Sequence, residues 1–129
     1  KNLIATGPDS QELYERGITA SFEYLGLDAA DALTYYSQSK DLVNWGNSPD
    51  KIKAIITQKW IAVNGITAEQ SWFDYSRTGY PSGLPIPLNY TGSADRPVRL
   101  IYPSGEYSAN GDNVPAQPNA FTEKMFWAK

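Results

Sequence analysis

Carboxylates and aromatic rings are the side chains of this sequence that are plentiful enough to suggest a chemical role. The 129-residue chain has 14 acidic residues, 4 Trp, 9 Tyr and 4 Phe, and it has neither His nor Cys. The absence of His and Cys excludes Ser–His–Asp triads, imidazole acid–base catalysis, thiol nucleophiles, thiolate metal sites and disulfides. Two-carboxylate glycoside hydrolysis stays open, although no acidic pair stands out in a glycine-framed loop. We therefore assign no catalytic residue, no metal and no cofactor.

The aromatic residues suggest a sugar-binding surface. An aromatic ring stacks on the apolar C–H face of a pyranose, while nearby amides and carboxylates bond to the hydroxyl groups. The candidate ligand-binding residues lie outside the predicted helices: Trp45 in the loop 44–47, and Tyr80 and Tyr90 in the proline-rich segment. Four other aromatic residues are predicted to lie in the core: Phe22, Trp60, Phe73 and Trp127.

Four charged residues are predicted to have structural roles. Asp74 and Arg77 are three positions apart on a predicted helix, which is close enough for an ion pair that braces the following turn. Arg99 and Glu106 are assigned structural roles as well. The segment 110–113 resembles a calcium loop only superficially, because it lacks the alternating ligands and the distant Glu, and it is predicted to be a turn.

The first 78 residues are predicted to form four helices. N-cap residues and glycine stops place three of these helices at about 9–26, 48–65 and 67–77. The helix at 29–36 is predicted because residues 29, 32, 33 and 36 fall on one side. Ser48 is the predicted N-cap of the third helix, and residues 67–70 fit a capping box for the fourth. In the third helix Gln58 falls on the polar side. The short connections predict antiparallel hairpins like those of tetratricopeptide arrays. The first helix has a predicted apolar face of Tyr14, Ile18, Phe22 and Leu25.

The second half of the chain is predicted to be rich in loops, because 12 of the 19 Gly and Pro residues fall between positions 79 and 118. Residues 98–102 are predicted to form a short strand or an extended buried segment. One or two helical turns follow at 103–110. Residues 119–127 are predicted to form a terminal turn of helix docked on the body through their aromatic side chains. The fold class is therefore mainly α, with tetratricopeptide-like hairpins and a loop-rich C-terminal half.

The charge balance argues against a nucleic-acid partner, and the hydropathy argues against a membrane-spanning segment. A net charge of −3 leaves no basic surplus for binding nucleic acid through its phosphates. No apolar stretch is long enough to span a bilayer. Neither nucleic acid nor a membrane-spanning segment is therefore expected.

Three ordered segments resemble the C-terminal signature of the SusD/RagB family of nutrient-binding lipoproteins. The first runs over 59–65 and continues through the Trp-Phe-Asp-Tyr-Ser-Arg-Thr-Gly-Tyr-Pro sequence at 72–81. The second is Arg-Pro-Val-Arg-Leu-Ile-Tyr-Pro at 96–103, and the third is Lys-Met-Phe-Trp at 124–127. The order and spacing of these segments carry the resemblance.

The resemblance implies a helical, non-catalytic protein that is lipid-anchored on the outer face of a bacterial outer membrane. Such proteins bind a nutrient glycan, or in some members a peptide, and act as a lid on a TonB-dependent transporter. Intact members begin with a lipidated Cys, so the chain is expected to be a C-terminal fragment of a larger protein. Within it, helical hairpins at 1–78 would carry a docked, loop-rich tail at 79–129. A fragment with uncovered helix faces is expected to self-associate or to be marginally stable.

Two alternatives to this interpretation stay open. One is the carboxylate-based glycoside hydrolase, which the acidic and aromatic composition allows. The other is a tetratricopeptide-like adaptor that holds a peptide in a helical groove, although the loop-rich second half is unlike a simple helical array.

Overall fold

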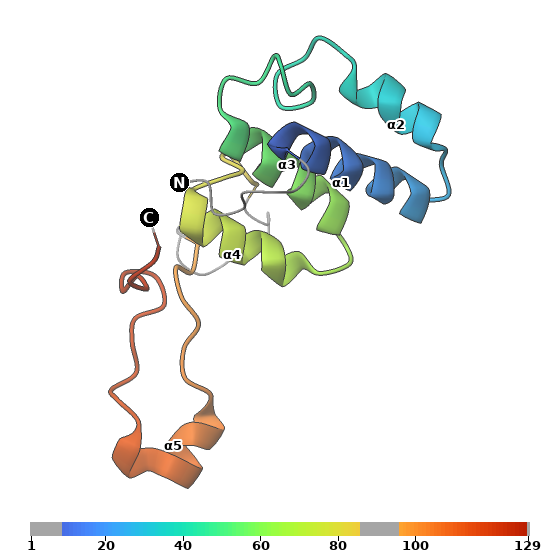
Figure 1. Ribbon diagram of the computed structural model, residues 1–129. Helices are drawn as coiled ribbons and strands as arrows, with labels where there is room; N and C mark the ends of the chain where they lie inside the picture. The colour runs from blue at the N-terminus through green and yellow to red at the C-terminus, as the bar shows by residue number, and fades with distance from the viewer. Residues whose placement is uncertain (1–8, 86–95, 129) are drawn as a thin grey trace.

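The computed structural model describes residues 9–85 and 96–128, and in these two ranges the chain is helical with no strand (Figure 1). The mainly α prediction is therefore confirmed, and no helix is long and apolar enough to cross a membrane in the part of the chain that is described. In chain order the elements are α1 (Ser10–Tyr24), α2 (Ala29–Tyr36), α3 (Lys51–Val63), α4 (Ala68–Thr78), α5 (Ser104–Asn110) and the 3-10 helix η1 (Gly111–Asn113).

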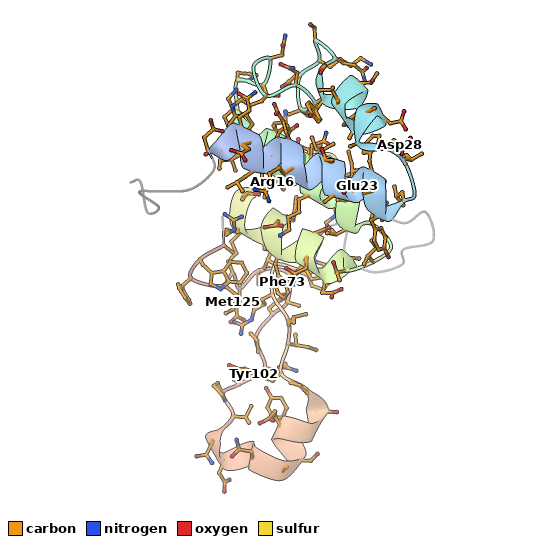
Figure 2. All side chains as sticks on the ribbon, turned by 45° about the vertical axis from the view of Figure 1, so that its right-hand side comes forward. Arg16, Glu23, Asp28, Phe73, Tyr102 and Met125 are labelled. Carbon is orange, nitrogen blue, oxygen red and sulfur yellow. The ribbon has the colours of Figure 1, made fainter. Side chains whose placement is uncertain are left out.

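The first four helices form the body of the molecule. Helix α1 packs against both α2 and α3, and α3 packs against α4. A short turn lets α4 run back along α3, as the predicted hairpin requires (Figure 1). Residues 96–128 form an arm that extends away from these four helices and has α5 at its tip (Figures 1 and 2).

Helix α1 begins and ends as its sequence predicts. The Asp9 carboxylate accepts a 2.8 Å hydrogen bond from the backbone N–H of Glu12, so it caps an otherwise unpaired donor. After the helix, Gly26 has a φ of +81°, a conformation that glycine adopts without strain. This turn lets the N–H groups of Gly26 and Leu27 donate to carbonyls of the last helical turn, each at 3.0 Å.

The predicted cap of α3 is wrong, whereas that of α4 is confirmed in position and not in its hydrogen bonds. Helix α3 is capped by Asp50, whose carboxylate accepts from the Lys53 N–H at 2.9 Å. Ser48 is instead fully buried in the preceding loop, where its hydroxyl donates to Asn44 O and accepts from Leu42 N. A carboxylate nearer the helix start competes successfully for the cap because its charge also complements the helix dipole. Thr67 precedes α4 but makes no side-chain cap bond, so the capping box at 67–70 is not formed.

The core of the body lies where α1, α2 and α3 meet. Its buried members are Tyr14, Ile18, Ala32 and Ala54. The small residues Ala32 and Ala54 let the helices approach closely, and larger side chains surround them. The partly buried apolar residues packed on this core are Phe22, Tyr35, Tyr36, Leu42, Trp45 and Ile55.

Several predicted core positions are more exposed than expected. Phe22, Trp60 and Trp127 are only partly buried, and Phe73 is 39% exposed. Leu25 is exposed at the end of α1, where the chain turns away. Gln58 differs in the opposite direction: it is buried, although its position on the polar side of α3 predicts an exposed side chain.

Side-chain hydrogen bonds hold the two limbs of the arm together. The Gln117 amide accepts from Tyr102 N and donates to Tyr102 O, both at 3.1 Å, so one side chain substitutes for a strand partner. Tyr107 of α5 also donates to Gln117 Oε1 at 3.1 Å. Nearer the body, Val98 N donates to Ala120 O at 2.7 Å. The arm is therefore a loop whose two limbs are joined by hydrogen bonds.

The arm differs from its prediction in two places. Residues 98–102 are neither a strand nor buried, since Leu100 is 70% exposed and Ile101 is also exposed. The end of the chain forms turns and no helix, and Phe126 is 96% exposed. Lys124 and Ala128 nevertheless line a small hollow together with Tyr75 of α4. The predicted helical turns at 103–110 are confirmed by α5, which buries none of its residues.

Candidate functional site

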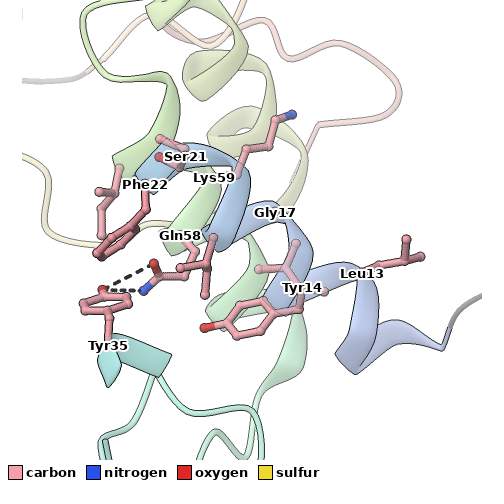
Figure 3. Close-up of a pocket in the computed structure, with 12 residues that line it drawn as sticks. Leu13, Tyr14, Gly17, Ser21, Phe22, Tyr35, Gln58 and Lys59 are labelled. Carbon is pink, nitrogen blue, oxygen red and sulfur yellow. Dashed lines mark hydrogen bonds between the residues drawn. The ribbon is translucent and has the colours of Figure 1, made fainter. Parts of the chain in front are cut away.

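An apolar groove of about 390 Å³ lies between α1 and α3 (Figure 3). Side chains of Leu13, Ile18 and Ile61 supply much of its apolar lining, and Gly17 and Ala62 leave room between the two helices. At one end the Tyr35 ring meets the Gln58 amide, and the Phe22 ring lies 5.5 Å from that of Tyr35. The groove is therefore built from the apolar faces of helices.

The Gln58 amide and the hydroxyl groups of Tyr14 and Tyr35, which lie beside this groove, are already paired within the protein. Gln58 Nε2 donates to Leu42 O at 2.7 Å and to the Tyr35 hydroxyl at 3.0 Å. The Tyr14 hydroxyl donates to Leu42 O at 3.1 Å and to Val43 O at 2.9 Å, and burial raises the pKa of Tyr14 to about 12. Because these donors are used, the groove matches an apolar surface better than a ring of sugar hydroxyls.

Trp45 is held in the loop between α2 and α3 by contacts with the body. Its ring centroid lies 5.3 Å from that of Tyr14, and the Lys51 ammonium lies 4.9 Å from the Trp45 ring. Lys51 also donates to the backbone carbonyl of Trp45. These contacts stabilise the loop at the start of α3. A ligand-binding role for Trp45 stays a prediction.

Tyr80 connects the end of α4 to the start of α3. Its hydroxyl donates to Asp50 Oδ2 at 2.7 Å, and its N–H donates to Thr78 Oγ1 at 3.1 Å. Hydrogen bonds from the Lys53 N–H and from Tyr80 lower the pKa of Asp50, and the bond to Asp50 raises the pKa of Tyr80. The other proline-segment candidate, Tyr90, lies outside the described residues.

Asp74 is the centre of a small charge cluster between α3 and α4. Its carboxylate lies 3.1 Å from Arg77 on its own helix, as the spacing predicts, and 2.6 Å from Lys59 on α3. Burial raises the pKa of Asp74, but the hydrogen bonds and charges of Lys59 and Arg77 outweigh it and lower the pKa below its usual range. The carboxylate is therefore ionised at neutral pH and ties the two helices together.

We expect Asp74→Asn to lower the free energy of unfolding by about 1–2 kcal/mol at pH 7, because it removes a mostly buried partner of two cations. The lowered pKa means that the stabilisation is present above the unfolded-state pKa of about 3.9 and is lost as pH falls through the folded-state pKa. Urea unfolding at several pH values should show the difference at pH 7 and a smaller one below about pH 4. The exposed residue Asp112 offers the control Asp112→Asn, and an equal loss there at pH 7 would contradict the prediction.

Arg99 and Glu106 lie on the arm and not in this cluster. Arg99 Nε donates to Leu100 O at 3.3 Å, and the Glu106 N–H donates to Pro103 O at 3.0 Å in the first turn of α5. The structure thus brings Asp74 and Arg77 together, whereas Arg99 and Glu106 each make local contacts. Their structural roles stay predictions.

A second hollow, of about 210 Å³, lies between α3 and α4 and is here called the aromatic hollow. Its aromatic members are Trp60 of α3 and Trp72 and Tyr75 of α4. The remaining lining residues are Asn64, Ala68, Ser71, Leu84 and Arg96. Sequence reasoning did not identify this hollow. The missed signal is spacing: 60 and 64 are four apart, and 68, 71, 72 and 75 share one helical face.

The described residues contain no group of three or more His, Cys, Asp or Glu that is arranged to hold a metal ion. Residues 2–103 match the profile of a SusD-like family whose description is starch-binding associating with outer membrane. The chain belongs to the SusD-like family. No curated protein and no solved structure matches it.

The family match confirms the resemblance that the three segments indicated, and it locates the features of this SusD-like chain. Both the Asp74 cluster and the aromatic hollow lie inside residues 2–103. Helix α5 and the returning limb of the arm lie beyond the matched range. The matched range covers the helical body and the outgoing limb of the arm, whereas the third resembling segment, at 124–127, lies beyond it.

Proposed function

We propose that this SusD-like chain binds a nutrient glycan at the cell surface without chemically changing it. The family match over residues 2–103 carries the proposal, because SusD-like proteins are described as starch-binding and associated with the outer membrane. Aromatic side chains beside hydroxyl and amide groups, as in the aromatic hollow, are suited to such a ligand.

Two carboxylates of the body have pKa values opposite to those that hydrolysis requires. A glycoside hydrolase needs a carboxylic acid whose raised pKa lets it protonate the glycosidic oxygen. The pKa values of Asp50 and Asp74 are both lowered, so these two carboxylates are ionised and accept hydrogen bonds at neutral pH. Neither is suited to the role of proton donor.

The same proposal includes a transporter partner, a membrane anchor and a larger parent protein. The bound glycan would pass to a TonB-dependent transporter, with a lipid anchor holding the intact protein on the outer membrane. The chain would be the C-terminal part of a larger protein, with a helical scaffold at 1–78 and a loop-rich tail at 79–129. Exposed apolar side chains on two scaffold helices support the expected self-association, since uncovered faces of this kind pack on another surface. These side chains are Leu13, Ile52 and Ile61.

A peptide ligand is the second candidate, and the apolar groove is the observation that favours it. The groove between α1 and α3 is about 390 Å³ and is lined mainly by apolar side chains. Amphipathic helices bind in grooves of this kind through apolar anchors. This candidate includes both a peptide nutrient and the tetratricopeptide-like adaptor.

Native gel electrophoresis in the presence of soluble starch tests the proposal directly. We expect starch to retard the chain relative to a starch-free gel, and incubation with starch to release no new reducing ends. Retardation together with new reducing ends would assign the chain to the glycoside hydrolases. Equal mobility in both gels would contradict starch binding.

A further inference from the structure

We propose that the aromatic hollow is a subsite for one neutral pyranose ring. This inference rests on the proposed glycan-binding function and adds the place where a sugar is bound. It concerns Trp60, which the sequence assigned to the core, and Trp72, which lies in the segment 72–81 that carries the family resemblance.

The two aromatic residues of α4 are held in place before any ligand arrives. The Trp72 indole N–H donates to Pro97 O at 2.9 Å, which ties the ring to the arm, and the Phe73 ring lies 5.2 Å from it. The Arg96 guanidinium lies 5.4 Å from the centre of the Tyr75 ring. Arg96 is itself fixed by donating to the carbonyls of Leu84 and Pro85. Rings that are already ordered lose little conformational entropy on binding.

The polar side chains of the hollow suit the hydroxyl groups of a sugar. Ser71 Oγ is buried and has no hydrogen-bond partner among the described residues. A buried hydroxyl without a partner is unfavourable, so rotation of this side chain towards a ligand hydroxyl would recover a lost hydrogen bond. Asn64 is exposed at the end of α3 and carries an amide that both donates and accepts.

Three other hollows of the described residues lack this combination. The hollow between α4 and the arm has one aromatic residue, Tyr75, and no amide side chain. The groove between α1 and α3 is apolar, and its Gln58 amide is already bonded to Tyr35 and Leu42. The hollow beside α5 is polar and has a single aromatic residue, Tyr107. The aromatic hollow brings three aromatic residues together with an amide and an unpaired hydroxyl. The family description names starch, a neutral glucan, so the ring expected here is a neutral pyranose.

Calorimetric titration of the full chain with maltoheptaose, a soluble linear fragment of starch, tests the subsite. We expect Trp60→Ala to weaken binding about tenfold, which is the value of one well-placed aromatic contact. Asn64→Ala is the second variant, because its exposed side chain is not needed for folding, and it should weaken binding about threefold. The control is Phe126→Ala, which removes a 96% exposed aromatic ring outside the hollow and should leave binding unchanged. Circular dichroism checks that each variant is folded.

The outcomes separate this inference from the proposed function. Weaker binding in both hollow variants, with Phe126→Ala unchanged, supports the subsite. If starch retards the wild-type chain and all three variants equally, the subsite is overturned while glycan binding stands. If neither starch nor maltoheptaose binds the wild-type chain, both proposals are overturned. A loss in Phe126→Ala equal to that in Trp60→Ala would also overturn the subsite, because the contact would then be nonspecific.

Discussion

Replacing Tyr14 by Ala is expected to lower the free energy of unfolding by about 4 kcal/mol, in the range of large aromatic-to-alanine changes in a core. The Tyr14 side chain is 7% exposed, its ring packs against Trp45, and its hydroxyl donates to the carbonyls of Leu42 and Val43. The substitution therefore removes a core ring and both of its bonds to the loop between α2 and α3. Urea unfolding followed by tryptophan fluorescence measures the change.

Two further variants separate the contributions of Tyr14. Tyr14→Phe keeps the ring and loses only the hydroxyl bonds, so we expect a loss of about 1–1.5 kcal/mol. Tyr24→Ala removes a ring of the same type from the end of α1, where it is 71% exposed, and should change stability by less than about 0.5 kcal/mol. Equal losses in Tyr14→Ala and Tyr24→Ala would show that the core does not lie where α1, α2 and α3 meet.

Gln58→Leu is expected to lower the free energy of unfolding by about 2 kcal/mol, although it replaces a polar residue in a helix by an apolar one of similar size. The Gln58 amide donates to Leu42 O and to the Tyr35 hydroxyl, which become less well paired without it. Leu42 has a φ of +62°, a strained conformation for a residue other than glycine, and its hydrogen bonds help to hold it there.

The control for Gln58→Leu is Gln70→Leu, at an exposed glutamine in α4. This change should be near neutral, within about 0.5 kcal/mol. Thermal unfolding by circular dichroism compares the two variants. If Gln58→Leu is as stable as wild type, the paired amide does not hold the loop.

Gln58 was misassigned because a contact with a distant loop decides its burial. Helical periodicity groups residues by face and by polarity, so it placed a glutamine on the polar side of α3. The loop backbone at Leu42 nevertheless presents a carbonyl to that helix, and a buried carbonyl requires a donor. Ser48 was misassigned for a related reason, because the same loop uses its hydroxyl. The need of a buried loop for hydrogen-bond partners arises from the tertiary fold, and no pattern of neighbouring residues in the sequence indicates it.

Local signals were sufficient where the contact itself is local. Asp74 and Arg77 are one helical turn apart, and their pairing could be predicted from that spacing. Lys59 could not be added to the pair, because it reaches Asp74 from another helix. The bounds of α2 followed from the residues that share one side of 29–36. The stop after α1 followed from Gly26, whose φ is positive in the structure.

The arm and the aromatic hollow required the structure. The apolar run at 98–102 is typical of a buried strand, yet the Gln117 amide satisfies the backbone of Tyr102 and leaves Leu100 exposed. Trp60 is apolar and lies on a periodic stripe, which is equally typical of a core residue and of a wall of a binding site. Only the position of α4 beside α3 shows that Trp60 and Trp72 flank a hollow.

A glycan array probed with the chain is the most direct test of the central claim that this SusD-like protein binds a glycan. We predict binding to starch-type glucans or to another neutral glycan family, with affinity that falls in Trp60→Ala and not in Phe126→Ala. If the chain is the C-terminal part of a larger protein, as proposed, that intact protein should bind the same class more tightly. If neither the chain nor the intact protein binds any glycan, the claim is contradicted, and the apolar groove between α1 and α3 becomes the place to search for a peptide ligand.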